Sequence, residues 1–172
     1  MNEVLRAIAS RRSCRRYRSE PLREADLAAI LEAGTWAASG MGAQPAVLVA
    51  VQDPETRAQL QRLNAAVLGG GGDPFYGAPT VVAVLADPAR STCVEDGSLV
   101  IGNLMLAASA LGVGSCWIHR AREVFAAPEG KALLRAWGVP EHYIGVGHCI
   151  LGYPDGSLPA PKPRRPDAIR RV

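Results

Sequence analysis

The chain has 172 residues, of which 48% are hydrophobic and 20% are charged, and its formal net charge at pH 7 is +3. This length and composition predict one globular domain that buries roughly two thirds of its unfolded surface. No apolar run reaches the roughly 18 residues that a membrane-spanning helix needs, and no apolar segment follows the charged N-terminus as in a secretory signal.

The predicted elements alternate between helices and strands. In chain order they are a helix over residues 2–10, a helix over 23–37, a strand over 46–51, a helix over 54–68, a strand over 80–86, a helix over 95–111, a strand over 115–119, helices over 121–126 and 128–137, and a strand over 144–153. The apolar run 46–51 predicts a strand covered on both faces. The helix over 95–111 is apolar nearly all round, which predicts a central buried element. This order favours an α/β or α+β domain built on one central sheet.

Two segments do not form regular elements in this prediction. Four consecutive glycines at 69–72 precede the sequence DPFYGAP. This stretch is either a surface linker or a mobile lid, in which Phe75 and Tyr76 would face a ligand. The stretch 154–166 contains five prolines and predicts an extended arm, whose end at 168–172 is a candidate for a short edge strand.

The four cysteines do not mark a metal site or a disulfide framework. Cys14, Cys93, Cys116 and Cys149 contain no CxxC pair and no spacing typical of metal ligands. We expect reduced thiols in a cytoplasmic protein, with Cys116 and Cys149 buried in strands as small apolar side chains.

Positive charge gathers in two distant parts of the chain. Five of the eight residues in Arg11–Arg18 (RRSCRRYR), here called the arginine segment, are arginines, and five further cations lie within 162–171. Planar guanidinium groups bind phosphate or carboxylate edges well. A nucleic-acid surface would add aromatic platforms, but aromatic residues make up only 5% of the chain. We therefore predict that the two patches converge on one small anion, with a nucleic-acid-binding module as the less favoured alternative.

No residue pattern supplies a complete catalytic site. The chain lacks GxGxxG after a strand, GxxxxGK[ST] and GxSxG, and its three histidines are too scattered for a metal triad. His119 is kept as a candidate because it ends a predicted strand where loops face a ligand. Glu95 and Asp96 begin a predicted helix and are interpreted as residues that stabilise its N-terminus. A cofactor that brings its own chemistry and a phosphate reconciles the basic charge with the missing catalytic residues.

The order of motifs along the chain resembles the nitroreductase family of FMN enzymes. RRSCRRYRSEPL is similar to the family's opening RRSxRx(Y/F), and the resemblance continues through LEAGTWAASGMGAQP, PFYGAP, EDGSLVIGNLMLAASALG, GVGSCWI, GVGHCILGY and PKPRRP. It implies an α+β fold with three α/β/α layers around a mostly antiparallel sheet, a homodimer, and FMN at the subunit interface. It also implies one domain over 1–172, of which 154–172 is an extended C-terminal arm.

The resemblance further implies a set of cofactor-binding residues. One subunit would bind the phosphate, the ribityl chain and one edge of the ring through Arg11, Arg12, Ser13, Arg15, Asn64, Ile118, His119, Lys162 and Arg164. The partner subunit would line the isoalloxazine ring through Ser39, Gly40, Met41 and Gln44. In this arrangement Asn64 contacts the polar edge of the ring, and the backbone of Ile118 and His119 reaches the ring. Lys162 and Arg164 close on the phosphate.

The chain departs from the family pattern above the flavin. Ala38, Gly42 and Ala46 stand where a proline, an asparagine and an aromatic residue are common, and His119 stands where glycine is common. These differences imply a wider or differently polar substrate pocket.

The activity that the resemblance implies is ping-pong hydride transfer. NADH or NADPH would reduce the flavin and leave, and a nitro compound, a quinone or a related small acceptor would then be reduced, with no side chain acting as acid or base. A flavin-binding protein without NAD(P)H turnover and a divergent flavin dehydrogenase or dehalogenase stay open as alternatives. Neither nucleic acid nor a membrane is an expected partner.

Overall fold

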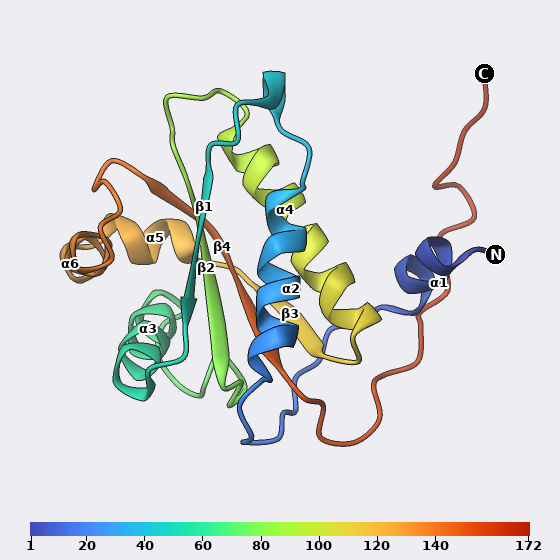
Figure 1. Ribbon diagram of the computed structural model, residues 1–172, viewed down its shortest axis with the longest axis horizontal. Helices are drawn as coiled ribbons and strands as arrows, with labels where there is room; N and C mark the ends of the chain where they lie inside the picture. The colour runs from blue at the N-terminus through green and yellow to red at the C-terminus, as the bar shows by residue number, and fades with distance from the viewer.

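A four-stranded antiparallel sheet organises the computed structural model, which describes residues 1–172 (Figure 1). Its strands are β1 (Ala46–Val51), β2 (Thr80–Ala86), β3 (Gly114–Ile118) and β4 (Ile144–Gly152), in the spatial order β1-β2-β4-β3. Every neighbouring pair is antiparallel. The predicted α+β class and the predominantly antiparallel sheet are therefore confirmed.

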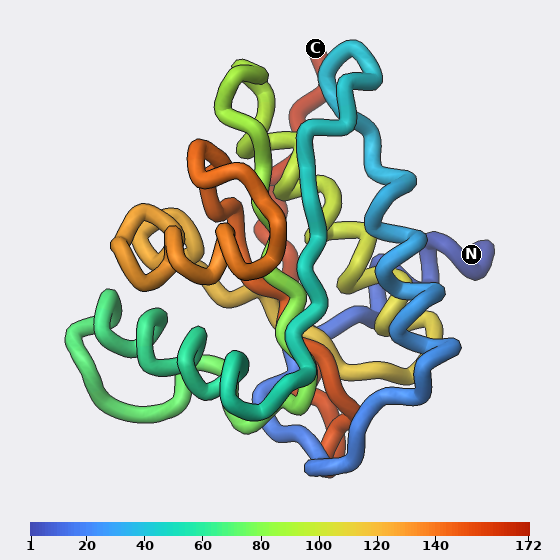
Figure 2. The backbone as a smooth tube through the Cα atoms, turned by 60° about the vertical axis from the view of Figure 1, so that its left-hand side comes forward, coloured from blue at the N-terminus to red at the C-terminus, as the bar shows by residue number.

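Helices cover both faces of this sheet. They are α1 (Glu3–Ser10), α2 (Glu24–Thr35), α3 (Pro54–Val67), α4 (Cys93–Ala110), α5 (Ala121–Ala126) and α6 (Pro128–Ala136), with a short 3-10 turn η1 (Gly40–Gly42). The helices α2 and α4 lie on one face, whereas α3, α5 and α6 lie on the other (Figures 1 and 2). The helix α1 stands apart and contacts α4. This is the expected three-layer arrangement, and no helix combines the length and hydrophobicity needed to cross a bilayer.

The central strand β2 explains why two separate cores form. All seven of its residues are buried, and alternate side chains point to opposite faces. Val81, Ala83 and Leu85 belong to the core beneath α3, α5 and α6, whereas Val82 and Val84 belong to the core beneath α2 and α4. An uninterrupted apolar run is what a strand covered on both faces requires.

The strand β1 differs from the prediction. Its apolar run also favoured burial on both faces, but β1 lies at the edge of the sheet and only Val51 is buried. Apolar composition does not indicate which strand has two neighbours, so the edge position was not predictable from the run alone. The helix α4 likewise buries its sheet-facing side only, because Val94 and Leu99 on its outer side are 40% and 51% exposed.

Two glycines allow the backbone to pack closely around α5. A methyl group on Gly145 of β4 would meet the carbonyl oxygen of Ala121, and one on Gly130 of α6 would meet the carbonyl oxygen of Val124. These contacts involve backbone atoms, which cannot move aside as a side chain does. The close approach expected from the glycines of the last strand is confirmed at Gly145.

The glycine run leads into a hydrogen-bonded turn. All four glycines over 69–72 have positive φ, and the Asp73 carboxylate then accepts hydrogen bonds from the N–H groups of Phe75 and Gly77. Phe75 is fully buried in the core, so the alternative in which its ring faces a ligand is wrong for this residue. Tyr76 is partly exposed, and it has a left-handed φ of 53°.

The C-terminal arm, residues 154–172, contains neither helix nor strand. Its start is tied to the arginine segment, because Tyr17 forms a bridge with Pro154 and the Asp155 N–H donates to the Arg16 carbonyl (3.0 Å). The end of the arm, over 168–172, forms no strand within this chain, which corrects the suggested edge strand. A short sequence with two adjacent arginines has no apolar face to hold it against the sheet.

Candidate functional site

The five arginines of the arginine segment separate by their surroundings. Arg16 pairs with Asp155 and Arg18 pairs with Glu20, each at 3.0 Å. Arg11, Arg12 and Arg15 form no ion pair. The positive charge without an ion-pair partner is therefore carried by Arg11, Arg12 and Arg15.

Arg11 and Arg12 follow directly after α1 and are partly buried. Nη1 of Arg12 donates to the carbonyls of Ala9 and Arg11 at 2.8 and 2.6 Å, so this side chain folds back over the end of the helix. Nη1 of Arg11 is buried and has no hydrogen-bond partner. A buried charged donor without an acceptor is costly, and an anion bound at this point would satisfy it.

The arginine segment is fixed against the outer edge of β3. Ser13 forms a parallel bridge with Ser115, and the Cys14 N–H donates to the Ser115 carbonyl (2.9 Å). The Cys14 side chain is buried against Gly114, where a methyl group would come within 2.8 Å of its sulfur. Tyr17 donates its hydroxyl to the Cys14 carbonyl (2.7 Å), and burial raises the pKa of this phenol. The segment thus presents its arginines from a rigid base.

The far end of β3 is held by a buried amide. Asn64 of α3 is fully buried, its Nδ2 donates to the His119 carbonyl (2.9 Å), and its Oδ1 accepts from Nε of Arg120 (3.0 Å). Arg120 has a left-handed φ of 74°, which the two hydrogen bonds stabilise. Both polar atoms of the Asn64 amide are thus bound within the chain, and its contact with a ring stays a prediction. Ile118 is buried and His119 is exposed.

The outer edge of β3 is partly open. The strand is the last in the sheet, and the arginine segment covers it only at Ser115. Ser115 and Ile118 are three residues apart, so about 10 Å of strand separates the arginines from the 118–120 loop. An elongated ligand with a phosphate at one end can therefore run along this edge and use unpaired backbone groups.

The second group of predicted residues lies in the loop around η1. Met41 and Gln44 have left-handed φ values of 55° and 48°, and Met41 is fully exposed. The Gln44 N–H donates to Oγ of Ser39 (3.0 Å), and the Gly40 N–H donates to Oδ1 of Asp96 (3.0 Å). The loop is thus a strained but hydrogen-bonded turn that projects from the body of the protein.

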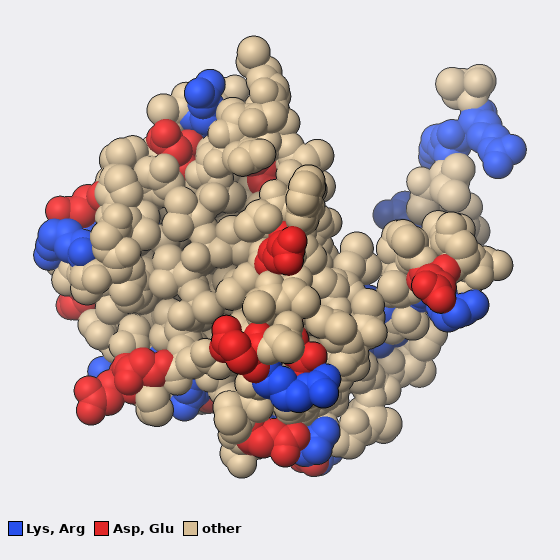
Figure 3. All heavy atoms as spheres, viewed as in Figure 1, with Lys and Arg blue, Asp and Glu red and all other residues tan.

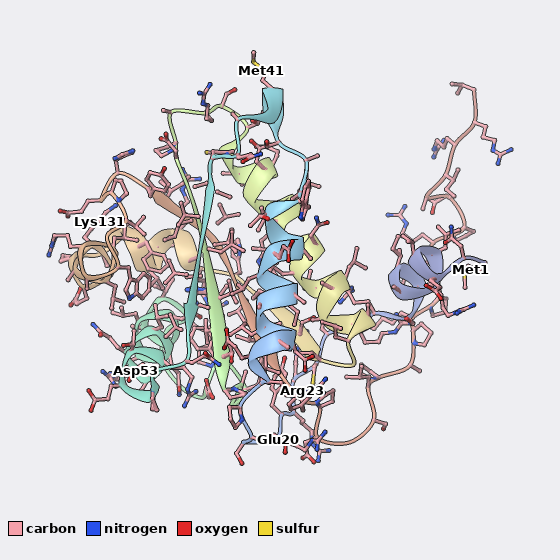
Figure 4. All side chains as sticks on the ribbon, viewed as in Figure 1. Met1, Glu20, Arg23, Met41, Asp53 and Lys131 are labelled. Atoms are coloured by element: carbon pink, nitrogen blue, oxygen red, sulfur yellow. The ribbon has the colours of Figure 1, made fainter.

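The two groups lie apart in the single chain. Figure 4 shows Met41 at the top of the molecule, whereas α1, which ends directly before Arg11, lies at the right, and Glu20 and Arg23, which follow the arginine segment, lie at the bottom. Within one chain the loop around η1 therefore does not face the arginine segment. A single site that uses both groups needs two copies of the chain.

Lys162 and Arg164 are not brought to the arginine segment in this chain. Both are exposed on the arm, and the Arg164 guanidinium donates to the Lys162 carbonyl at 2.9 Å. Figure 3 shows basic side chains near the free end of the arm standing clear of the body. The predicted convergence of the two basic patches is absent within the single chain, because the prolines keep the arm extended.

His148 lies in the core behind the 118–120 loop. It is fully buried, both ring nitrogens lack a hydrogen-bond partner, and its ring lies between those of Phe75 and Phe125, with centroids at 5.4 and 5.8 Å. Burial, with the nearby charge of Arg120, lowers the pKa of His148 to about 3. The imidazole is therefore neutral at pH 7, and it does not face the open edge of β3.

Residue patterns alone missed two residues that shape these groups. Asp96 was interpreted as a helix-terminal residue, yet it is buried at 4% exposure and binds the loop around η1. Arg120 was not singled out, yet it anchors Asn64. Nothing local distinguished either residue, because Asp96 stands beside the exposed carboxylate Glu95 at the start of α4 and Arg120 lies in a short loop.

Comparison with known proteins connects this geometry to a family. The profile of the Nitroreductase family matches residues 8–71 and 69–153. A solved nitroreductase with bound FMN from Bacteroides fragilis is 34% identical, with a TM-score of 0.92 over 100% of both chains.

Two curated relatives agree with this assignment. A protein of Archaeoglobus fulgidus with the provisional name NADH dehydrogenase/NAD(P)H nitroreductase is 34% identical over 90% of this chain and 87% of its own length. The FMN reductase [NAD(P)H] of Bacillus subtilis is 25% identical over 96% of this chain and 71% of its own length. Since the profile spans most of the chain and the fold agrees over its full length, the protein belongs to the nitroreductase family.

Proposed function

We propose that the protein is an FMN-dependent oxidoreductase that moves a hydride from NADH or NADPH to a small acceptor such as a nitro compound or a quinone. The observation that carries the proposal is the buried, unpartnered Nη1 of Arg11 at the base of the open edge of β3. The related structure with bound FMN and the relative named FMN reductase [NAD(P)H] support it.

The residues at this edge fit a flavin mononucleotide. Arg11, Ser13 and Arg15 are proposed to hold the phosphate and the ribityl chain, because they combine guanidinium groups that form no ion pair with a hydroxyl beside β3. The backbone at Ile118 and His119 is proposed to meet the ring, since the Asn64 amide fixes this loop from behind. Lys162 and Arg164 are not included in the proposed site.

The loop around η1 is proposed to cover the ring from a second copy of the chain. Ser39, Gly40, Met41 and Gln44 project far from the arginine segment of their own chain, so they complete a site only in a homodimer. Apolar side chains exposed on α1 and α4 support such an assembly. These residues are Val4, Leu5, Ile8, Val94 and Leu99.

The residues of the chain are proposed to bind and orient the cofactor and the substrate. When bound, FMN supplies the hydride chemistry. Backbone N–H groups and guanidinium groups near the ring stabilise negative charge that develops there, and the covering loop excludes water. No side chain is proposed as an acid or base, and selectivity is proposed to depend on the pocket that Ala38, Gly42, Ala46 and His119 leave above the ring.

Anaerobic titration tests this function. The purified protein, reconstituted with FMN, is expected to show a bound-flavin spectrum that bleaches on addition of NADH or NADPH and returns on addition of a quinone or a nitroaromatic compound. Absence of FMN binding overturns the proposal. Flavin binding without bleaching identifies a flavin-binding protein without NAD(P)H turnover.

A further inference from the structure

Asp96 is a buried carboxylate that has no cation beside it. It lies in the first turn of α4, is 4% exposed, and takes part in no ion pair. Burial of an unpaired carboxylate is unfavourable unless hydrogen bonds stabilise the charge. Two donors do so here, since the Gly40 N–H reaches Oδ1 at 3.0 Å and the Thr92 hydroxyl reaches Oδ2 at 2.9 Å.

The contact between α4 and the loop around η1 is also sterically specific. A methyl group on Gly40 would lie 2.5 Å from Oγ1 of Thr92, so the loop approaches α4 closely only because residue 40 is glycine. The left-handed residues Met41 and Gln44 follow immediately. Such a backbone persists when its surroundings fix it, and the hydrogen bond from Gly40 to Asp96 is the link between this strained turn and the rigid helix.

We propose that Asp96 is a positioning residue that holds the Ser39–Gln44 loop in the shape needed to cover the flavin of the other subunit. This inference rests on the proposed FMN function and on the two-chain site. Asp96 does not touch the cofactor. It acts through Gly40, so its loss weakens flavin binding in the neighbouring subunit while the chain that carries the substitution keeps its own arginine segment intact.

Hydrogen exchange tests the anchor without any flavin. In apo-protein, Asp96→Leu removes both acceptors while keeping the branched shape of the side chain, and the Gly40 amide is expected to exchange at least about tenfold faster than in the wild type. Asp96→Asn keeps an oxygen for Gly40 and an N–H for Thr92, so it is expected to retain the protection. Glu95→Leu is the matched control, because this neighbouring carboxylate is exposed and accepts no side-chain hydrogen bond. Unchanged exchange at Gly40 in Asp96→Leu overturns the proposal, whether or not FMN binds.

Flavin affinity, read from quenching of FMN fluorescence, tests the consequence. Asp96→Leu is expected to weaken FMN binding by about tenfold or more, with Asp96→Asn and Glu95→Leu close to the wild type. Thermal unfolding of each apo-variant separates this loss from a general loss of folding. Faster exchange at Gly40 with unchanged FMN affinity overturns the positioning role. Absence of FMN binding in the wild type instead overturns the proposed function, and with it the flavin part of this inference.

Mixed dimers test the action across subunits. When differently tagged Arg11→Ala and Asp96→Leu chains are co-expressed, the mixed dimer contains one site with both defects and one site with neither. One tightly bound FMN per mixed dimer is expected, whereas each parent dimer loses flavin at both sites. Mixed dimers that bind no better than the parents overturn the cross-subunit role.

Discussion

Arg11 and Arg18 carry the same guanidinium group in different surroundings. Arg11 has a buried nitrogen without an acceptor, whereas Arg18 pairs with Glu20 and its guanidinium carbon lies 5.5 Å from the centre of the Tyr153 ring. A phosphate would give Arg11 an acceptor that it lacks. To bind Arg18, the same phosphate would have to compete with the Glu20 carboxylate. The type of residue is thus less informative about binding than the set of partners already present.

Substitution of these two arginines tests the proposed phosphate site. Arg11→Ala is expected to weaken FMN binding roughly 10- to 100-fold, because it removes a charge-assisted contact of about 1.5–3 kcal/mol. Arg18→Ala is expected to change the affinity by less than about twofold, since this side chain is engaged elsewhere and exposed. Equilibrium titration of apo-protein with FMN measures both. Equal affinities for wild type and Arg11→Ala contradict the assignment.

His148 predicts an acid-sensitive contribution to folding. Its pKa is lowered from 6.5 to about 3 in the folded protein, so between these values the unfolded chain binds more protons than the native one. This stability is fully present above the unfolded pKa and is lost as the pH falls. The free energy of unfolding is therefore expected to decrease by about 2 kcal/mol between pH 7 and pH 5 through this group alone.

The variant His148→Leu isolates this contribution. Because it lacks the titrating imidazole, its free energy of unfolding is expected to fall less than that of the wild type between pH 7 and pH 5. At pH 5 it is expected to be at least as stable as the wild type, because both imidazole nitrogens lack partners in the wild type. Urea unfolding of both proteins at equal concentration and at both pH values measures the difference. Parallel pH dependence of the two proteins is the outcome that contradicts a buried neutral imidazole.

At the scale of elements, close backbone packing around α5 determines which glycines tolerate substitution. Gly145→Ala places a methyl group against the Ala121 carbonyl and is expected to destabilise the fold by more than about 3 kcal/mol. Gly102→Ala in α4 meets no atom within 4 Å and is expected to be neutral or to stabilise by up to about 1 kcal/mol. Thermal or urea unfolding distinguishes the two, and a stable Gly145→Ala protein contradicts the packing described for α5.

Local patterns predicted nearly all elements because each has its own period or apolar run. The strands β1 and β2 and the helix α5 match their predicted ranges, and the ends of the other elements shift by at most two residues. What local patterns did not predict depends on contacts between distant residues. The edge position of β1 follows from the order of strands, and the burial of Phe75 follows from a turn that the Asp73 carboxylate fixes.

The candidate site was predicted to a different extent in its two halves. Arg11 and Arg15 form no ion pair, the Arg15 guanidinium carbon lies 5.9 Å from the centre of the Tyr76 ring, and the binding role of both stays a prediction. The hydrogen bonds of the Asn64 amide to the 118–120 loop were not expected from the sequence. Hydrogen bonds between residues more than fifty positions apart leave no periodic signal in a sequence.

At the scale of the whole molecule, exposed apolar side chains predict assembly. Leu99 on α4 is 51% exposed, and Leu68 at the end of α3 is similarly exposed on the other side of the sheet. Leu99→Glu is expected to convert a dimer of twice the 18.1 kDa chain mass into a monomer, whereas Leu68→Glu is expected to leave the dimer intact. Sedimentation equilibrium measures the mass, and a dimeric Leu99→Glu protein contradicts this use of α4.

The separation of the η1 loop from the arginine segment has a thermodynamic consequence. If each flavin is held by two chains, cofactor binding and subunit association share one free energy, and each strengthens the other by the same factor. Dilution then releases flavin, and added flavin tightens the dimer. In that case the apparent affinity for FMN is expected to depend on protein concentration, and the flavin-loaded fraction is expected to depend on the amount of the protein as well as on the supply of cofactor.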